Sequence, residues 1–432
     1  MSLFLGIDVG TSGCRGCVID AAGNIQAETR TLLPAPRRNG NTIEQDPALW
    51  WSALAETLDA LTAQVPMAAI EAIGLDGTSS TLLCCDSAGT PLAPALMYND
   101  ARAVAAAQRI AACSPHDSAA HGASSSLAKL LWLLDTPAGK SATHALHQAD
   151  WLLGQLSGRY GISDENNALK LGYDVVNRCW PDWLAELDIP QELLPEVVPA
   201  GRAIGTPDAM ACARWGFEPQ AHIVSGTTDS TASFIATGAQ PGEAVTSLGS
   251  TLVLKVLADQ PVFEPANGIY SHRLGDRWLV GGASNSGGAV LKQYFSEADI
   301  ARLTLQLQPD SPTGLDYYPL VSPGERFPIN DPLLRPRLDP RPVDDTVFFQ
   351  GILEGIAHIE LEGYRRLAAL GAPWPERVLT TGGGAANRGW GALRAALLGV
   401  PVIAASHQEA AYGTALLARS CGHSCCAGLE GC

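Results

Sequence analysis

Two short segments place glycine and hydroxyl residues after an apolar strand pattern, and both could bind phosphate. The first is Asp8–Ser12 (DVGTS), which follows the apolar stretch that begins at Phe4. Backbone N–H groups and hydroxyls in such a turn can bind an anion, and the Asp8 carboxylate could hold Mg²⁺ through water beside it. The second is Ser247–Thr251 (SLGST), which allows the same chemistry. Plain hairpin turns favour these residue types too, so each segment alone leaves both interpretations open.

A third glycine segment, Gly382–Gly384, follows a strand pattern at Val378 and Leu379. Glycine lets the backbone approach a bulky ligand closely, but each glycine in an ordered element costs about 0.5–1 kcal/mol relative to alanine. Three in a row therefore favour a nucleoside resting on them over a purely structural need. Asn387, just beyond, could bond a base edge or cap the following helix.

Asp229 lies in a hydroxyl-rich turn (TTDST, 227–231) before an apolar helical stretch. Asp, Ser and Thr are all good helix N-caps, so the spacing alone favours a cap at this position. The alternative is that Asp229 is a general base, since a carboxylate near a bound hydroxyl group can accept its proton.

The cysteines and histidines give weaker signals. Cys14 and Cys17 form a C-x-x-C that spans a turn and a strand, where small core residues are expected, because a redox motif should open a helix. His144 and His147 lie in a polar stretch and are predicted at the surface. The C-terminal tail could bind metal in principle, but it offers no second ligand cluster, so a frayed terminus is expected there. Its candidate ligands are Cys421, His423, Cys425, Cys426 and Cys432.

The elements around these motifs alternate between strands and helices. Asp46-Pro47 predicts a helix start, and apolar residues at spacings of three and four follow from Trp50 to Leu61. Strands then helices in alternation favour an α/β layered fold. The two strand–turn–strand patterns recur 239 residues apart, from Gly10 to Gly249. This recurrence predicts a duplicated domain with a cleft between the copies.

Composition bounds the possible functions. The chain of 432 residues is longer than a domain with a single hydrophobic core usually is, so two domains are expected. A formal net charge of −16 disfavours nucleic acid and anionic membrane as general partners. No apolar run approaches a membrane span of about 18 residues, and the N-terminus reads as a strand. Eleven cysteines, an odd number at irregular spacing, favour a reduced cytoplasmic setting.

Taken in order, these motifs resemble those of the FGGY carbohydrate kinases, which belong to the actin-like ATPase superfamily. The resemblance extends from Leu5 to about Leu417, and Tyr98–Arg102 (YNDAR) and Glu409–Ala415 (EAAYGTA) also look like family segments. It implies an α/β fold with two actin-like (ribonuclease H-like) ATPase domains around a central cleft. The first would be residues 1–236, the second 237–408, and the last helix, about 409–432, would return to the first.

The resemblance also implies roles for individual residues. The first domain would bind a sugar, and the second would bind ATP with Mg²⁺; the sequence does not determine whether the chain is a monomer or a homodimer. Asp229 would be the general base, which overrides the cap preference, and Asp8 would hold Mg²⁺ through water. The other residues implied in binding are Gly10, Thr11 and Ser12 for the γ-phosphate side, Gly249 and Ser250 for the phosphates, Gly383, Gly384 and Asn387 for adenosine, and Ser79, Asp229 and Ser230 for the sugar.

The sugar itself is indicated by one departure from the family pattern. Xylulokinases usually carry Met-His-Gly after the strand at Ile73–Leu75, whereas this chain has Asp76–Thr81 (DGTSST), with Ser80 in place of the His. That segment and Gly281–Gly288 (GGASNSGG) look closer to the D-ribulose kinases of cyanobacteria and plants. A ketopentose is therefore expected, D-ribulose favoured and D-xylulose as the alternative. A non-kinase actin-like ATPase is less favoured, since the chain has no segment left over for a peptide-binding domain.

Overall fold

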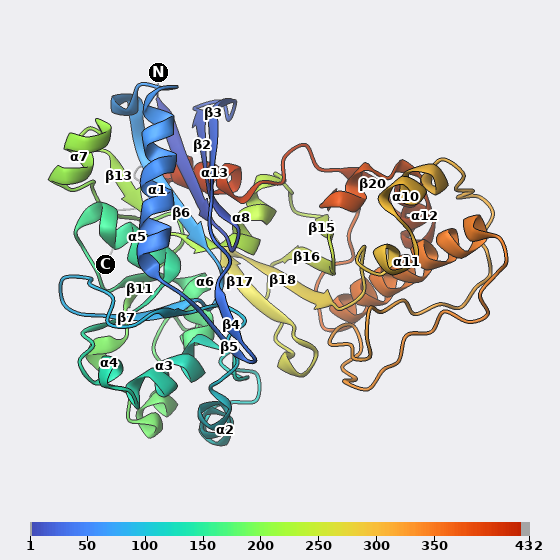
Figure 1. Ribbon diagram of the computed structural model, residues 1–432, viewed down its shortest axis with the longest axis horizontal. Coiled ribbons are helices and arrows are strands. Elements are labelled where there is room, and N and C mark those ends of the chain that lie inside the picture. The colour runs from blue at the N-terminus through green and yellow to red at the C-terminus, as the bar shows by residue number, and fades with distance from the viewer. Residues whose placement is uncertain (1, 425–432) are drawn as a thin grey trace. The chain divides into compact units, whose positions relative to one another are not determined.

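The computed structural model of the chain describes residues 2–424 (Figure 1). Its contacts divide the chain into two compact units. The first comprises Met1–Ala236 with Glu409–Cys432, and the second comprises Thr237–Gln408. Among the described residues no helix is long and apolar enough to cross a membrane.

The first unit contains a large sheet and a small one. The large sheet has the order β12-β13-β6-β1-β2-β3, with β14 also paired to β6, and the small sheet has the order β4-β5-β8-β7-β9. The strands are β1 (Leu3–Val9), β2 (Gly13–Asp20), β3 (Ile25–Leu32), β4 (Arg37–Asn39), β5 (Thr42–Gln45), β6 (Ile70–Gly77), β7 (Leu82–Cys85), β8 (Ala95–Leu96), β9 (His144–His147), β12 (Ala203–Gly205), β13 (His222–Val224) and β14 (Thr227–Thr228), and a separate pair is formed by β10 (Ile162–Asp164) and β11 (Glu196–Val198).

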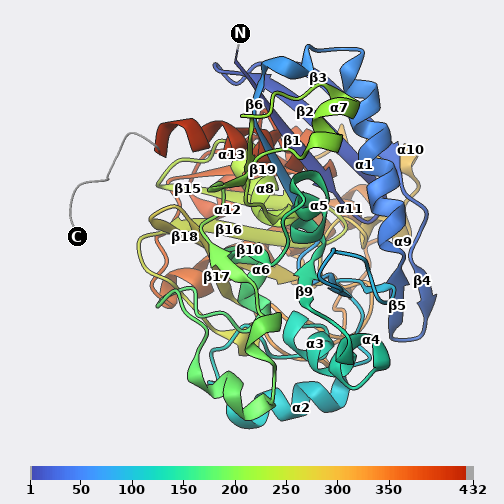
Figure 2. The same cartoon turned by 90° about the vertical axis from the view of Figure 1, so that its left-hand side faces the viewer.

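Helices cover both faces of the large sheet, and Figure 2 shows α1 and α13 on its opposite sides. The helices of this unit are α1 (Pro47–Thr62), η1 (Met67–Ala69), α2 (Val104–Cys113), α3 (Ser126–Leu134), α4 (Pro137–Lys140), α5 (Gln148–Ser157), α6 (Glu165–Ala168), η2 (Leu169–Leu171), η3 (Asp182–Leu187), η4 (Gln191–Leu193), α7 (Ala209–Trp215), α8 (Asp229–Ala236) and α13 (Ala410–Ser424).

The side-chain alternation of β1 explains this two-sided cover. Leu5 and Ile7 pack with α1 and α5 in one apolar cluster, whereas Phe4 packs with α13 in another. Gly6 lies where α13 approaches most closely, because a Cβ atom there would sit 2.1 Å from the carbonyl oxygen of Ala411. A strand buried on both faces reads as a nearly continuous apolar run, as 3–9 does.

The second unit repeats this plan with a sheet of order β17-β18-β16-β15-β19-β20. As with β1, the strand β15 pairs antiparallel with the next strand and parallel with a later one. The repeat supports the duplication that the two turn motifs predicted. The elements are β15 (Glu243–Leu248), β16 (Leu252–Ala258), η5 (Pro265–Asn267), β17 (Tyr270–Leu274), β18 (Arg277–Ser284), α9 (Leu291–Tyr294), α10 (Glu297–Thr304), α11 (Asp345–Ala369), β19 (Arg377–Thr381), η6 (Gly383–Ala386), α12 (Arg388–Leu398) and β20 (Val402–Ala404).

Several local predictions can be compared directly with the structure. Asp46 caps α1 by accepting a hydrogen bond from the Ala48 N–H at 3.0 Å, as predicted. Cys14 and Cys17 are buried in the core, also as predicted. The surface prediction for His147 is wrong. Its ring is fully buried between the Asp150 carboxylate of α5 and the Ser126 hydroxyl of α3, because these two helices supply polar partners at the end of β9.

Candidate functional site

The carboxyl ends of three strands in the first unit gather the two predicted carboxylates, Asp8 and Asp229, and a third, Asp76, that was not predicted as a site residue. Asp8 is near the end of β1, where strand register places it beside Arg15 of β2 on one side and Asp76 of β6 on the other. The Asp8 side chain is almost fully buried, and the Arg15 guanidinium donates to it at 2.7 Å. A buried carboxylate is stable when it is paired in this way.

Asp76 lies beside Asp8 and is completely buried. The Thr414 hydroxyl on α13 donates to one of its carboxyl oxygens, and the other oxygen has no hydrogen-bond partner among the described residues. Burial raises the pKa of Asp76 well above its usual range, and the negative charges of Asp8 and Asp229 raise it further. Asp76 therefore favours its uncharged form.

Asp229 is brought to the same place by β14, whose Thr227 lies opposite Asp76 in the sheet. It is the first residue of α8, is half-buried, and accepts a hydrogen bond from the Ser230 N–H at 2.6 Å. The N-terminus of a helix stabilises a negative charge, as the carboxylate of Asp229 carries. Ser230, the predicted sugar ligand, is exposed.

The donor set here limits how Mg²⁺ could be held. Within residues 2–424, no three His, Cys, Asp or Glu side chains are grouped to hold a metal ion. Mg²⁺ usually keeps several waters and takes one or two carboxylates together with substrate phosphates. Asp8 at a strand end fits that mode of binding, in which phosphate and water supply most of the ligands.

The turn that follows β6 carries the predicted sugar ligand Ser79. The Thr81 N–H donates to the Thr78 carbonyl at 3.3 Å, and Gln148 accepts from the backbone and hydroxyl of Thr78 at 3.0 and 2.8 Å. Ser80 has a φ of 69°, in the left-handed region, and its buried hydroxyl has no partner in the described part of the chain. Ser79 is half-buried. Such a turn holds polar groups that a ligand could complete.

The predicted nucleotide ligands of the second unit come together. A pocket of about 480 Å³ is lined by Gly249 and Ser250 after β15, Gly383 and Gly384 after β19, and Asn387 before α12. Lys292, Thr304 and Trp390 also line it. Two segments far apart in the sequence, 249–250 and 383–387, therefore contribute the residues that the motifs singled out.

The glycines of this pocket differ in what they permit. A Cβ atom at Gly383 would meet nothing within 4 Å, and at Gly249 it would meet a single oxygen at 3.8 Å. At Gly384 it would overlap Leu248 at 2.6 Å, and Gly382 has a φ of 78° close to the Leu248 carbonyl. Chain packing therefore already requires glycine at 382 and 384, whereas at Gly383 the space beside the backbone is open.

The other predicted residues take ordinary turn and cap geometries as well. Gly10 donates its N–H to the Gly13 carbonyl at 3.1 Å, and Gly249 does the same to Thr251 at 3.2 Å. Thr11 is half-buried and Ser12 exposed in the first of these turns. Asn387 caps α12 by accepting from the Trp390 N–H at 2.9 Å, so it fills the cap role while lining the pocket.

Comparison with known proteins identifies the family. Residues 3–236 match the model of the FGGY family of carbohydrate kinases, N-terminal domain, and residues 244–420 match that of its C-terminal domain. The chain belongs to the FGGY family of carbohydrate kinases. It is thus a carbohydrate kinase with the two-domain actin-like, ribonuclease H-like ATPase fold.

Individual relatives of this FGGY kinase carry different sugar names. It is 24% identical to a xylulose kinase of Escherichia coli (strain K12) over 90% of this chain and 83% of that one. A crystal structure of a xyloylose kinase from Brucella ovis has a TM-score of 0.89 at 26% identity, covering 98% of this chain and 91% of that chain. A gluconate kinase structure from Lactobacillus acidophilus has a TM-score of 0.87 at 20% identity, covering 99% and 90%.

Sequence reasoning missed several buried polar residues around the Thr78–Thr81 turn of this kinase. Lys129 is fully buried within an apolar helix, where the pattern gave no reason to expect a charge. Gln148 bonds Thr78 from the start of α5, 70 residues away in the chain. Asp100 is fully buried in the YNDAR segment, which resembles a family segment but indicates no role for this residue. The predicted cysteine tail beyond Cys421 lies outside the described side chains.

Proposed function

We propose that this kinase transfers the γ-phosphate of ATP to a terminal hydroxyl of a ketopentose, with D-ribulose favoured. The observation that carries the ATP part is the pocket lined by five residues predicted for the nucleotide. Its volume of about 480 Å³ lies within the usual range of ligand pockets, about 300–1,000 Å³. Gly383 and Gly249 leave room for close approach of a ligand to the backbone.

The phosphates are held by short-range polar groups in this proposal. Gly249 and Ser250 contact the phosphate chain, and Gly10, Thr11 and Ser12 contact the γ-phosphate. Asp8 would hold Mg²⁺ through water, and the bound ion would supply positive charge that neutralises the phosphate oxygens. With a net charge of −16, the chain depends on such local groups to bind a polyanion.

Asp229 is the general base of the proposed reaction. The sugar hydroxyl oxygen forms a bond to the γ-phosphorus while the bond to the bridging oxygen breaks, and ADP leaves with that electron pair. The hydroxyl proton passes to a carboxylate oxygen of Asp229. The protein contributes mainly by positioning and by stabilising charge, since the transition state of phosphoryl transfer is loose. The proximity of Asp229 to Asp8 through β14 and β6 supports this assignment.

The preference for D-ribulose rests on the turn Thr78–Thr81. Ser79, together with Asp229 and Ser230, binds the sugar hydroxyls, and the unpartnered hydroxyl of Ser80 is a further donor for them. Serine hydroxyls reach less far than the imidazole of the usual xylulokinase motif, so they suit hydroxyls in other positions. D-Xylulose is the second candidate, because relatives matched over most of their length are named xylulose kinases.

A coupled assay of ADP release tests the proposal. The wild-type kinase with Mg²⁺ and ATP should release ADP rapidly with a ketopentose and slowly without sugar or with glycerol or gluconate. Phosphorus NMR of the product should show one phosphate ester at the terminal carbon. Equal ADP release with and without every sugar would point instead to a bare ATPase, and glycerol or gluconate as the best acceptor would refute the ketopentose assignment.

A further inference from the structure

We propose that Lys129 is a positioning residue for sugar binding, because its side chain fixes the main chain of the Thr78–Thr81 turn. This inference rests on the proposed function, in which that turn contacts the sugar. Lys129 does not itself touch the substrate. It acts through the carbonyl group of Ser80, and no sequence motif of the chain includes it.

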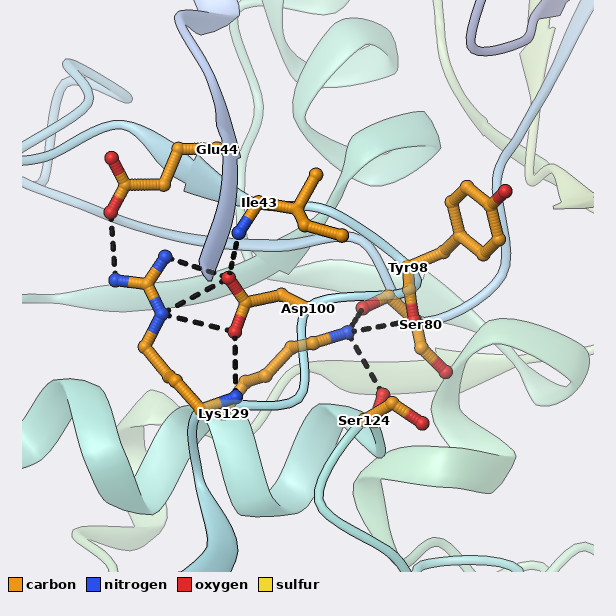
Figure 3. Close-up of polar contacts among 8 residues, drawn as sticks. Ile43, Glu44, Ser80, Tyr98, Asp100, Ser124 and Lys129 are labelled. Carbon is orange, nitrogen blue, oxygen red and sulfur yellow. Dashed lines mark hydrogen bonds and ion pairs between the residues drawn. The ribbon is translucent and has the colours of Figure 1, made fainter. Parts of the chain in front are cut away.

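The geometry at Lys129 is that of a cross-link between loops. Its ammonium group donates to the carbonyl oxygens of Ser80 at 2.7 Å, Ser124 at 2.8 Å and Tyr98 at 3.2 Å (Figure 3). In its protonated form Lys129 has three N–H donors, and these three bonds use all of them, whereas the neutral amine has two. The side chain is fully buried on α3, and each acceptor lies on a different segment of the chain.

The Ser80 contact is the one with consequences for a ligand. A left-handed φ such as the 69° of Ser80 is uncommon outside glycine, and it persists where the surroundings determine it. The bond from Lys129 to the Ser80 carbonyl is such a determinant. It sets the orientation of the peptide that follows Ser80, and with it the directions of the Ser79 side chain and the Ser80 hydroxyl.

A second set of contacts fixes the Tyr98 end of the cross-link. The buried Asp100 carboxylate accepts from the Ile43 N–H at 2.6 Å and from the Arg102 guanidinium, which also donates to Glu44 at 2.7 Å. Ile43 and Glu44 belong to β5, so the Tyr98–Asp100 segment is anchored to the small sheet (Figure 3). Lys129 therefore joins the sugar turn to a rigid support.

Packing alone does not require a lysine here. A methionine of similar length would fill the same buried space on α3 without the cost of burying a charge. The charges nearest Lys129 are those of Asp100, Arg102 and Lys170. Arg102 does not replace the three bonds of Lys129, since it is already committed to Asp100 and Glu44.

The variant Lys129→Met tests the inference, with Lys140→Met as the matched control, since Lys140 is exposed at the end of α4. In Lys129→Met we expect the KM for sugar to rise about tenfold or more and kcat/KM to fall by up to about 100-fold, as misplacement of a binding group can do. The KM for ATP should stay within about twofold. The control should leave all three constants unchanged.

Amide hydrogen exchange provides a readout that does not depend on the sugar. Without any ligand, the amides of 77–82 should exchange faster in Lys129→Met, while those of the large sheet stay protected. Unchanged exchange at 77–82 would overturn the inference. Faster exchange with unchanged sugar KM would mean that the turn is not the sugar site, so the proposed function would fail there. Ser79→Ala is expected to raise the sugar KM by itself, and an unchanged sugar KM in that variant would also mean that the turn is not the sugar site.

Two outcomes need a second variant. If Lys129→Met loses ATP and sugar affinity equally, or does not fold, Lys129→Gln retains two N–H donors on a shorter neutral chain. A folded Lys129→Gln should show a smaller rise in sugar KM with ATP KM preserved. Wild-type sugar KM in a folded Lys129→Gln, or a parallel loss of ATP affinity in both variants, would refute a positioning role.

Discussion

Asp8, Asp76 and Asp229 come from three separate strand ends, and their environments differ sharply. Burial and neighbouring negative charge raise the pKa of Asp76, whereas Asp8 is paired with Arg15 and Asp229 begins a helix. Carboxyl groups whose environments give them different pKa values can divide acid, base and binding roles between them. The uncharged form of Asp76 would spare the site a third negative charge when a polyphosphate binds.

The first prediction at this scale concerns the proposed base. Asp229→Asn keeps the shape of the side chain and removes its ability to accept a proton. Turnover should fall roughly 10²–10⁴-fold, the contribution typical of a general base, with ATP affinity little changed. Steady-state kinetics with calorimetric ATP titration would measure both. Asp117→Asn, at an exposed position, is the control. Retention of more than half of the wild-type turnover would mean that Asp229 only caps helix α8 and is not the general base.

A second prediction concerns Lys129 and pH. Burial is the main cause that lowers the pKa of Lys129 from 10.5 to about 7, while Asp100 opposes the change. Between pH 7 and 10.5 the native protein therefore binds fewer protons here than the unfolded chain, so this group adds stability as pH rises and loses it as pH falls towards 7. The free energy of unfolding of wild type minus that of Lys129→Met should increase with pH, by at most about 1.4 kcal/mol per unit.

Urea unfolding of both proteins at pH 7, 8 and 9 would measure that difference. A difference that is constant or falls over this range would show that Lys129 keeps its proton throughout. The result is independent of sugar binding, so it separates the protonation of Lys129 from its positioning role.

At the scale of elements, substitutions in the turns after β15 and β19 test the proposed nucleotide site. Gly383→Val and Gly249→Val meet little or no neighbouring protein, so the fold should tolerate both. Because the added atoms point into space that we assign to ATP, each should weaken ATP affinity about tenfold or more and leave sugar affinity nearly intact. Calorimetric titration of each ligand separately would measure this.

The control for these variants is Gly391→Val, also in open space but on α12. It should leave both affinities unchanged. If Gly383→Val and Gly249→Val bind ATP as wild type does, the pocket is not the nucleotide site. If both ligands are lost equally, the variants have a folding defect and the reduced ATP affinity does not locate the nucleotide.

Elements with a strong local signal could be predicted from the sequence. The Asp46 cap, the apolar face of α1 and the left-handed Gly158 that ends α5 all follow from residue types and spacing. The small sheet could not be predicted from the sequence, because β4 is exposed and β8 is a short strand that pairs with β5, a strand far from it in the chain. The burial of His147 could not be predicted for a similar reason, since it depends on Asp150 and Ser126 packing around the ring.

For the candidate site, the motifs predicted residues at strand ends and in turns, but they did not predict the buried polar residues that hydrogen-bond to those turns. Gly249, Gly383 and Asn387 could be predicted because turn chemistry is visible in sequence, and they line one pocket. Lys129 and Gln148 act through bonds to main-chain or side-chain groups 49 and 70 residues away. Such partners are fixed by the fold and leave no periodic pattern.

At the scale of the whole molecule, duplication gives each unit a strand that pairs antiparallel with the next strand and parallel with a later one, and a similar turn after that strand. The two turns have diverged in their surroundings. Asp8 and Arg15 accompany the first, and the glycines and Asn387 line a pocket with the second. This divergence is consistent with one unit serving the sugar and the other the nucleotide. The fold alone does not select a sugar, since similar structures are named for xylulose and gluconate kinases.

The acceptor preference tests the central claim most directly. Ribulose and xylulose differ in configuration at one carbon, and one unmatched buried hydroxyl costs about 1–3 kcal/mol, or roughly 5- to 150-fold in kcat/KM. We predict that the ratio of kcat/KM for D-ribulose to that for D-xylulose lies in this range for the wild-type kinase, and that Ser79→Ala reduces the ratio more than it reduces ATP affinity. A preference for D-xylulose of about tenfold or more, roughly 1.4 kcal/mol in the opposite direction, would contradict the ribulose assignment and make the enzyme a xylulokinase.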